Sequence, residues 1–200
     1  MKLNATVPLG RPRAFDPDVA LDRAMHVFWA TGYEGASLSN LTRAMRINRP
    51  SLYAAFGNKR QLFRKVLDRY MGGPVAFFSK ALAAPKAREV VEQIFRGTIR
   101  MAENRRVPPG CLLVQGALAC GSASARKEVA ARRAAADVAL CRRFRRAKRE
   151  GDLSKKADPA ELARYVLTVV RGMAVQSAGG ASRDQLRRIA RVALRAWPKG

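Results

Sequence analysis

The sequence is poor in the residues that build metal sites and disulfide frameworks. Its 200 residues include one histidine and three cysteines, Cys111, Cys120 and Cys141, and no two of the cysteines form a Cys-x-x-Cys pair. A zinc site and a secreted disulfide scaffold are therefore not expected, and we predict no metal and no cofactor. His26 lies among apolar residues of an expected helix, so we interpret it as a packed side chain and not as a general base.

The sequence also lacks long apolar runs and the motifs of common enzymes. No uncharged apolar stretch approaches the roughly 20 residues that span a bilayer, and the N-terminus has no apolar signal-peptide core. We therefore expect a cytoplasmic, nucleoid-associated protein with no membrane partner. A Gly-x-x-x-x-Gly-Lys phosphate loop and a Gly-x-Ser-x-Gly nucleophile elbow are absent, so we do not expect an enzyme.

Acidic residues are scarce relative to basic ones. The chain has 15 Asp and Glu against 39 Lys and Arg, which gives a formal net charge of +24. Such an excess attracts polyanions, mainly nucleic acid and secondarily anionic membranes. The segment from Arg126 to Arg149 is especially basic, with only Glu128 and Asp137 opposing. A solvated face is its simplest interpretation, and non-specific attraction to DNA is the functional alternative. Binding to a membrane surface is a weaker alternative, because Phe144 is the sole aromatic anchor in the segment.

Helix signals dominate the chain, and no strand-length run alternates β-branched with polar residues, so we predict an all-α fold. Asp16 before Pro17 predicts a helix start, and Gly32 a helix end. Asn58 is interpreted as the N-cap of the fourth helix, in preference to a base contact. Ser182 with Gln185 predicts a capping box. The expected helices cover residues 17–32, 37–45, 50–56, 59–70, 75–78, 87–104, 111–119, 125–150, 158–178 and 182–197.

Two of these helices have the spacing of a DNA-reading unit. Two short helices joined by a three- or four-residue turn form a helix-turn-helix, whose second helix enters the major groove. Here the pair is 37–45 and 49–56, with apolar residues such as Leu41 and Leu52 fixing the crossing angle. Spacing alone does not distinguish this arrangement from an ordinary helical hairpin.

The specific residues do distinguish it. Residues 28–42 read Phe-Trp-Ala-Thr-Gly-Tyr-Glu-Gly-Ala-Ser-Leu-Ser-Asn-Leu-Thr, and residues 52–59 follow the order Leu-Tyr-x-x-Phe-x-x-Lys. Over residues 14–70 the chain resembles the N-terminal domain of the tetracycline-repressor (TetR) family. The resemblance implies a three-helix DNA-binding domain followed by a helical domain for dimerisation and effector binding.

The resemblance also implies roles for individual residues. Arg49, Pro50 and Ser51 fall at the base-reading positions, where an arginine can bind guanine through two hydrogen bonds and a proline ring can contact a thymine methyl. The positions implied to contact phosphate are Tyr53 and Lys59, together with Ser37 and Ser39 at the start of the preceding helix.

One position departs from the family, and one segment precedes the matched region. Where the family usually has glycine in the turn, this chain has Arg46, and a positive φ there costs about 1 kcal/mol for a residue with a side chain. The Arg46 charge offsets this by approaching phosphate. Ahead of the domain, Arg11 and Arg13 in Gly-Arg-Pro-Arg are expected either to enter an A·T-rich minor groove or to form a solvated tail.

The second half carries the expected dimer and effector elements. Apolar stripes around Tyr165 and Ile189 are interpreted as dimer helices, as intramolecular core, or as both on different faces. Helices near 75–78, 90–101 and 111–119 are expected to line an effector pocket. The side chains that we expect in the core and not in the pocket are Phe77, Phe78, Phe95 and Met101.

Cys111 follows Pro-Pro-Gly at an expected helix N-terminus, with Arg105 and Arg106 nearby. Helix-terminal amides and cations stabilise a thiolate, and Gly-Cys-Leu-Leu resembles a branch of the family in which a cysteine senses electrophiles or oxidants. Cys111 is therefore a possible sensor thiol. The alternative, which the apolar neighbours favour, is a plain core cysteine.

These observations predict a sequence-specific transcriptional regulator, specifically a repressor. We expect a homodimer on double-stranded DNA with a palindromic operator, released by an unknown small-molecule effector or by a redox or electrophile signal. The rival interpretation is a structural nucleoid protein attracted by charge alone. The expected divisions are a flexible basic arm at 1–13, a helix-turn-helix domain at 14–71 and a helical effector-binding and dimerisation domain at 74–200.

Overall fold

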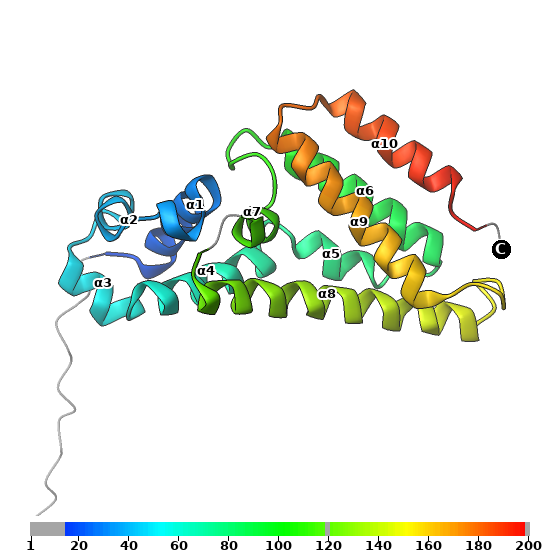
Figure 1. Ribbon diagram of the computed structural model, residues 1–200, viewed down its shortest axis with the longest axis horizontal. Helices are drawn as coiled ribbons and strands as arrows, with labels where there is room; N and C mark the ends of the chain where they lie inside the picture. The colour runs from blue at the N-terminus through cyan, green and yellow to red at the C-terminus, as the bar shows by residue number, and fades with distance from the viewer. Residues whose placement is uncertain (1–14, 119–120, 199–200) are drawn as a thin grey trace, which may run out of the picture.

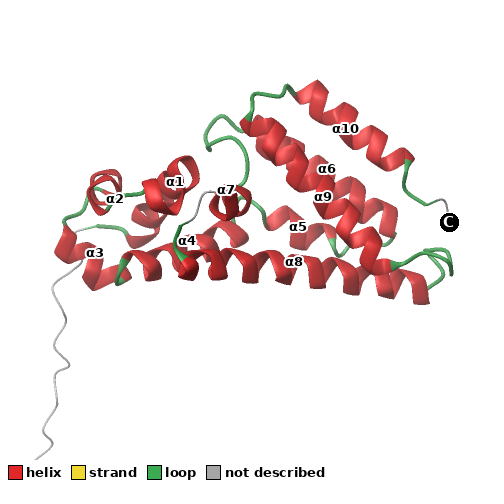
Figure 2. Ribbon diagram, viewed as in Figure 1, coloured by secondary structure: helices red, strands yellow, loops and turns green. Residues whose placement is uncertain are grey.

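The protein folds into α-helices that lie in an elongated arrangement. The computed structural model describes residues 15–118 and 121–198, and these form ten α-helices and no strand (Figures 1 and 2). The prediction of an all-α fold is therefore confirmed. The predicted basic arm, with Arg11 and Arg13, lies outside the described residues.

The first four helices form one end of the molecule. Their bounds are α1 Pro17–Gly35, α2 Leu38–Met45, α3 Arg49–Phe56 and α4 Lys59–Gly72. They enclose a core in which Trp29, Phe63 and Tyr70 are fully buried. The Trp29 and Tyr70 rings meet edge to face with centroids 4.9 Å apart, which ties α1 to α4.

Side-chain caps set the helix starts as the sequence predicts. The Asp16 carboxylate accepts from the backbone N–H groups of residues 18 and 19. Asn58 and Ser182 each form a capping box with a glutamine three residues later. Gly32 interrupts α1 with φ 71°, but helical geometry resumes and continues to Gly35, beyond the predicted end.

His26 is exposed on α1, so its interpretation as a packed histidine is wrong. The buried residues beside it, Met25, Phe28 and Trp29, follow the i, i+3, i+4 spacing of one helix face. His26 is turned about 100° from Met25, and this rotation takes it off that face.

The remaining helices build the rest of the molecule. Their bounds are α5 Ala76–Ala81, α6 Ala87–Glu103, α7 Leu112–Leu118, α8 Ala123–Arg149, α9 Pro159–Ala178 and α10 Arg183–Arg195. With 27 residues, α8 is about 40 Å long and runs beneath the other helices from α4 to the far end (Figure 1). It is therefore placed to connect the two ends.

Two buried clusters hold the chain together. The first combines α1–α4 with Leu112 of α7 and with Ala125 and Val129 of α8. The second lies among α6, α8, α9 and α10 and includes Phe144 and Trp197, whose ring centroids are 5.2 Å apart. The N-terminal helices thus share a core with α7 and α8. The division of the chain into domains at residues 72–73 stays a prediction.

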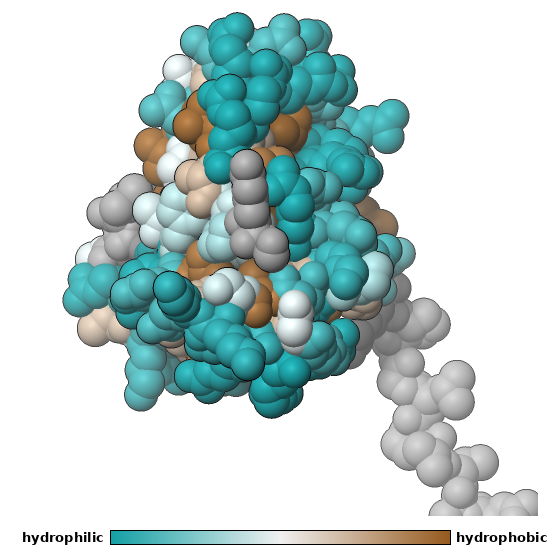
Figure 3. Space-filling view, turned by 90° about the vertical axis from the view of Figure 1, so that its right-hand side faces the viewer, coloured by the Kyte–Doolittle hydropathy of each residue, from teal (hydrophilic) through white to brown (hydrophobic). Residues whose placement is uncertain are grey.

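The end of the molecule opposite α3 is covered mainly by hydrophilic side chains, with small hydrophobic patches between them (Figure 3). Within residues 15–118 and 121–198, no helix has the length and apolar character needed to cross a membrane.

Candidate nucleic-acid interface

The segment from α2 to α3 has helix-turn-helix geometry. Arg46 ends α2 in the left-handed region, with φ 58° and ψ 45°, and its N–H bonds back to carbonyls of the last turn. It is the sole non-glycine residue with positive φ in the part of the chain that the structure describes. The position thus adopts the conformation that the family's glycine suits, and the chain accepts the cost of a side chain there.

The inner face of α3 is anchored to the domain core. Leu52 is fully buried and Phe56 nearly so, and they lie one helical turn apart. Asn48 caps the helix by accepting from Ser51 N at 2.8 Å. Lys65 of α4 donates to Ala55 O at 3.1 Å. Since a helix of eight residues is marginal alone, these contacts fix its orientation.

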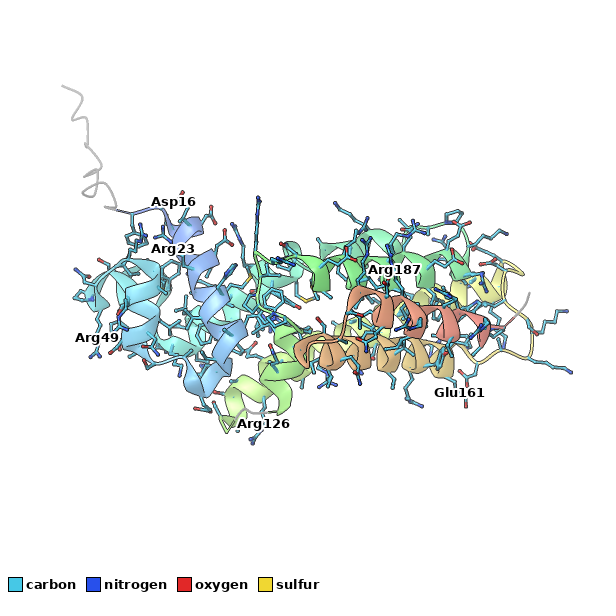
Figure 4. The ribbon with its side chains drawn as sticks, turned by 90° about the horizontal axis from the view of Figure 1, so that it is seen from above. Asp16, Arg23, Arg49, Arg126, Glu161 and Arg187 are labelled. Atoms are coloured by element: carbon cyan, nitrogen blue, oxygen red, sulfur yellow. The ribbon has the colours of Figure 1, made fainter. Side chains whose placement is uncertain are left out.

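The outer face of α3 is open to solvent. Arg49, Pro50, Tyr53 and Ala54 are exposed, with Tyr53 at 48%, while Ser51 is half-buried. The exposed residues follow i, i+1, i+4, i+5 spacing and therefore share one helix face. Arg49 lies at the extreme end of the molecule, directed away from the body (Figure 4).

Arg49 also contacts α2. Its Nη2 donates to the Oγ of Ser39 at 3.0 Å, so a predicted base-reading residue and a predicted phosphate contact are joined. Ser37 is exposed and serves as the N-cap of α2, accepting from Asn40 N at 3.1 Å. Arg46 is exposed in the turn between the two helices.

Lys59 begins α4, directly after its capping residue. Its Nζ lies 4.5 Å from the centroid of the Tyr33 ring, a cation–π arrangement that orients the ammonium beside the helix N-terminus. Asn58 accepts from Gln61 N at 3.0 Å, which confirms its interpretation as an N-cap. An anion at this point meets both a cation and the positive end of the helix dipole.

Ion pairs between one arginine and two aspartates hold the α4 helix against α1. Arg69 donates to both carboxylate oxygens of Asp22, at 2.8 and 2.7 Å, and to Asp18 at 3.0 Å. The hydrogen bonds with Asp22 raise the pKa of Arg69 above its ordinary value. The guanidinium stays charged, so the clamp holds at every pH at which the two carboxylates are ionised.

A second set of ion pairs joins α4 to α8. Arg132 of α8 donates to Asp68 of α4 at 2.7 Å and to Glu128 on its own helix at 2.9 Å. Arg64 of α4 lies 3.4 Å from Glu128. At the start of α8, Ser122 N donates to the carboxylate of Glu34 at 2.7 Å. Ion pairs and hydrogen bonds therefore connect α4 and α1 to α8.

Behind α4 lies a mainly apolar cavity of about 690 Å³, counting its opening. The three predicted helices contribute to it, and α8 and α9 complete it. Phe77, Phe78 and Met101 line this cavity, so the expectation that they lie outside the pocket is wrong, although Phe78 and Met101 also pack against the buried clusters. Phe95 is buried in the core as expected. The lining also includes two small residues, Ala136 of α8 and Ala174 of α9.

Cys111 forms part of the cavity wall at the N-terminus of α7. It is half-buried, and the Tyr70 hydroxyl of α4 donates to its Sγ at 3.2 Å. Burial, together with the contact to Cys111, raises the pKa of Tyr70 well above its usual range, so the phenol stays protonated as a donor. Arg105 and Arg106 are exposed on the preceding loop.

Sequence reasoning missed Arg69, Arg132 and Tyr70 as connecting residues. Arg69 is 47 residues from Asp22, and Arg132 is 64 residues from Asp68. No local pattern pairs residues so far apart. The one sequence feature that could have indicated such a role is the position of Arg69 next to the apolar residues of α4. Among the described residues, no cluster of three or more His, Cys, Asp or Glu is arranged to hold a metal ion.

Comparison with known protein families matches both halves of the chain. Residues 20–66 match the model described as bacterial regulatory proteins, tetR family. Residues 87–193 match the model described as tetracyclin repressor-like, C-terminal domain.

Individual relatives agree with these matches. The chain is 32% identical over 194 residues to the HTH-type transcriptional repressor ComR of Escherichia coli (strain K12), covering 95% of this chain and 92% of ComR. It is 35% identical over 117 residues to the HTH-type transcriptional repressor BdcR of the same organism, 58% of each chain.

Among solved structures, the fold is similar to a cysteine mutant of the TetR family transcriptional regulator CifR, complexed with 26 bp double-strand operator DNA. The TM-score is 0.89 at 44% identity, with 94% of this chain and 100% of that chain covered.

Proposed function

Because the chain belongs to the TetR family of bacterial regulatory proteins, a family of DNA-binding transcriptional regulators, we propose that it is a homodimeric repressor that an effector releases from a palindromic operator. It acts on DNA in the cytoplasm and performs no catalysis. The names of ComR and BdcR as repressors, and the operator complex of CifR, support this proposal.

The observation that carries the proposal is the division of α3 into two faces. Leu52 and Phe56 fix the helix from inside, while Arg49, Pro50 and Tyr53 project into solvent. A rigid helix with a polar outer face is the element that enters a major groove, where a guanidinium binds guanine O6 and N7. Tyr53, with Ser37, Ser39, Arg46 and Lys59 around the helix, contacts the flanking phosphates.

Dimerisation places two such helices on one duplex. On the surface of α9 and α10, Tyr165, Val169, Ile189 and Val192 line a shallow apolar groove, and Val192 is 56% exposed. Other residues of the predicted stripes, including Val166 and Trp197, are buried within the chain. The buried residues of the stripes belong to the intramolecular core, and the exposed ones are those that we propose for the dimer interface. The exposed face pairs with its copy and sets half-sites about 34–36 Å apart or a multiple of that.

The effector acts through α4. The cavity lies between α4 and the helices α5 to α9, and α4 holds α3 through Lys65 while it is itself held by Asp68 and Tyr70. A ligand that fits the cavity only after α4 has shifted favours a conformer with different half-site spacing. Because the effector then binds this conformer more tightly than the operator-binding one, it shifts the equilibrium and the operator is released.

Reaction of the Cys111 thiol with an electrophile or oxidant is a second candidate signal. Cys111 lines the cavity and its Sγ accepts from the Tyr70 hydroxyl, so an electrophile or oxidant that enters the cavity approaches a residue in contact with α4. An adduct on Sγ removes this hydrogen bond and occupies space beside α4. The half-burial of Cys111 and its place in the cavity wall favour this role over that of a plain core cysteine.

Selection of bound duplexes from a random library tests the proposal. The expected result is a palindromic sequence that binds two chains, with affinity about 10³-fold or more above random duplex at physiological salt. Equal binding of the selected and random sequences would instead support a charge-driven structural protein.

A further inference from the structure

The cavity behind α4 combines apolar walls with positive charge. Phe77, Phe78, Met101, Leu167 and Val170 supply walls from α5, α6 and α9. The empty space of about 690 Å³ includes the mouth of the cavity, through which a ligand can enter from solvent. No Asp or Glu is among the described lining residues, and the charged ones are Arg133 and Arg171.

The two guanidiniums differ in their partners. Arg171 of α9 donates to both oxygens of Asp137, at 3.0 and 3.1 Å, and is thereby neutralised. Arg133 is half-buried and forms no ion pair or hydrogen bond with any residue that the structure describes. The cavity therefore keeps one uncompensated positive charge.

The position of Arg133 on α8 explains why it faces the cavity. Its neighbour Arg132 is turned toward α4 and is bound by Asp68 and Glu128. Successive residues are about 100° apart around a helix, so Arg133 and Ala136, three residues on, share the cavity side. The α8 helix thus presents one cation to α4 and the next to the cavity.

A half-buried cation beside apolar walls is costly without a counter-charge. A carboxylate matches the planar guanidinium through two parallel hydrogen bonds, and hydrocarbon matches the walls. We propose that the cavity binds an apolar small molecule bearing a single carboxylate, which pairs with Arg133. A single unpaired cation selects a monoanion over a dianion. This inference rests on the proposed function, since it takes the cavity as the effector site.

The test is calorimetric titration of the full chain with octanoate, decanoate and 4-phenylbutanoate, each matched by its neutral primary amide. At least one carboxylate is expected to bind about tenfold to a hundredfold more tightly than its amide, the range of a charge-assisted hydrogen-bonded pair. In Arg133→Gln the carboxylate and the amide should bind equally. The control Arg142→Gln, an exposed position on the same helix, should keep the preference.

A cavity-filling variant, Val170→Phe, checks the location, because it should weaken both the carboxylate and the amide. The proposal is overturned if no carboxylate is preferred over its amide in the wild type, or if the preference persists in Arg133→Gln. Gel-shift binding of the selected operator without ligand is measured on the same proteins. If the wild type does not bind the operator, the result counts against the proposed function, while the titrations still decide the ligand class.

Discussion

Arg49 at the start of α3 donates a hydrogen bond to Ser39 on α2, with 3.0 Å between Nη2 and Oγ. Both side chains are exposed, so the bond is readily exchanged for one to DNA or water. A guanidinium has five N–H donors, and this bond uses one. Arg49 is therefore held in an outward orientation while most of its donors remain free for a base edge, which lowers the entropy lost on binding.

Lys59→Ala should weaken binding to every DNA sequence alike. Its ammonium lies at the N-terminus of α4 above the Tyr33 ring, a position suited to a phosphate and not to a base. Removing one phosphate contact should reduce the slope of log K against log salt by about one unit. Anisotropy titrations at several salt concentrations measure the slope. An unchanged slope, or a loss confined to one base pair, would refute the phosphate role.

Arg46→Gly should raise the free energy of unfolding by about 0.5–1 kcal/mol, because φ at this position is 58° and glycine removes the left-handed strain. Operator affinity should fall at the same time, since the charge that we propose to face a phosphate is lost. The matched control is Arg43→Gly in the helical part of α2, which should destabilise by about 1 kcal/mol. Urea unfolding gives both values. Destabilisation by Arg46→Gly would contradict the strain argument.

Arg69→Met should lower the free energy of unfolding, because it removes the bidentate pair with Asp22. The loss should be only about 1 kcal/mol, because the pair is partly exposed and is screened by solvent. The control Arg60→Met lies on the same helix at an exposed position without a partner among the described residues, and should be neutral. Urea unfolding of both variants checks this. Equal effects of the two substitutions would mean that the Arg69 clamp contributes no stability.

Alkylation of Cys111 with N-ethylmaleimide should reduce operator affinity about tenfold or more, a typical coupling between two sites. The adduct displaces the Tyr70 hydroxyl from Sγ and crowds α4. Cys111→Ser should bind operator normally and resist the reagent, whereas Cys141→Ser should remain sensitive. Peptide mass spectrometry reports which thiol has reacted. Full modification of Cys111 without loss of operator binding would identify it as a plain structural cysteine.

The sequence predicts the helices well because their ends are set locally. Asp16, Asn58 and Ser182 bond to backbone within three residues, so each cap is visible in a short stretch of sequence. The α2 and α3 pair follows in the same way from its turn and its buried leucines. The order Leu-Tyr-x-x-Phe-x-x-Lys then distinguishes this helix-turn-helix from an ordinary helical hairpin and indicates the family.

Features that depend on tertiary packing are not predictable in this way. Phe77 and Phe78 are recognisable as apolar from the sequence, but periodicity does not reveal that they line a cavity together with residues of α4 and of α6 to α9. The contact between Tyr70 and Cys111 joins residues 41 positions apart. The charge left on Arg133 becomes visible only when α8 is placed beside α9, where Asp137 pairs with Arg171 instead.

The most direct test of the account is the binding of Arg49→Ala to the selected operator and to a set of its single-base-pair variants. If α3 reads the major groove through Arg49, affinity for the operator falls by about 1–3 kcal/mol, and the preference disappears at one base pair in each half-site while it is kept elsewhere. An equal loss on every sequence, or no loss, would contradict the claim that this exposed helix face reads DNA.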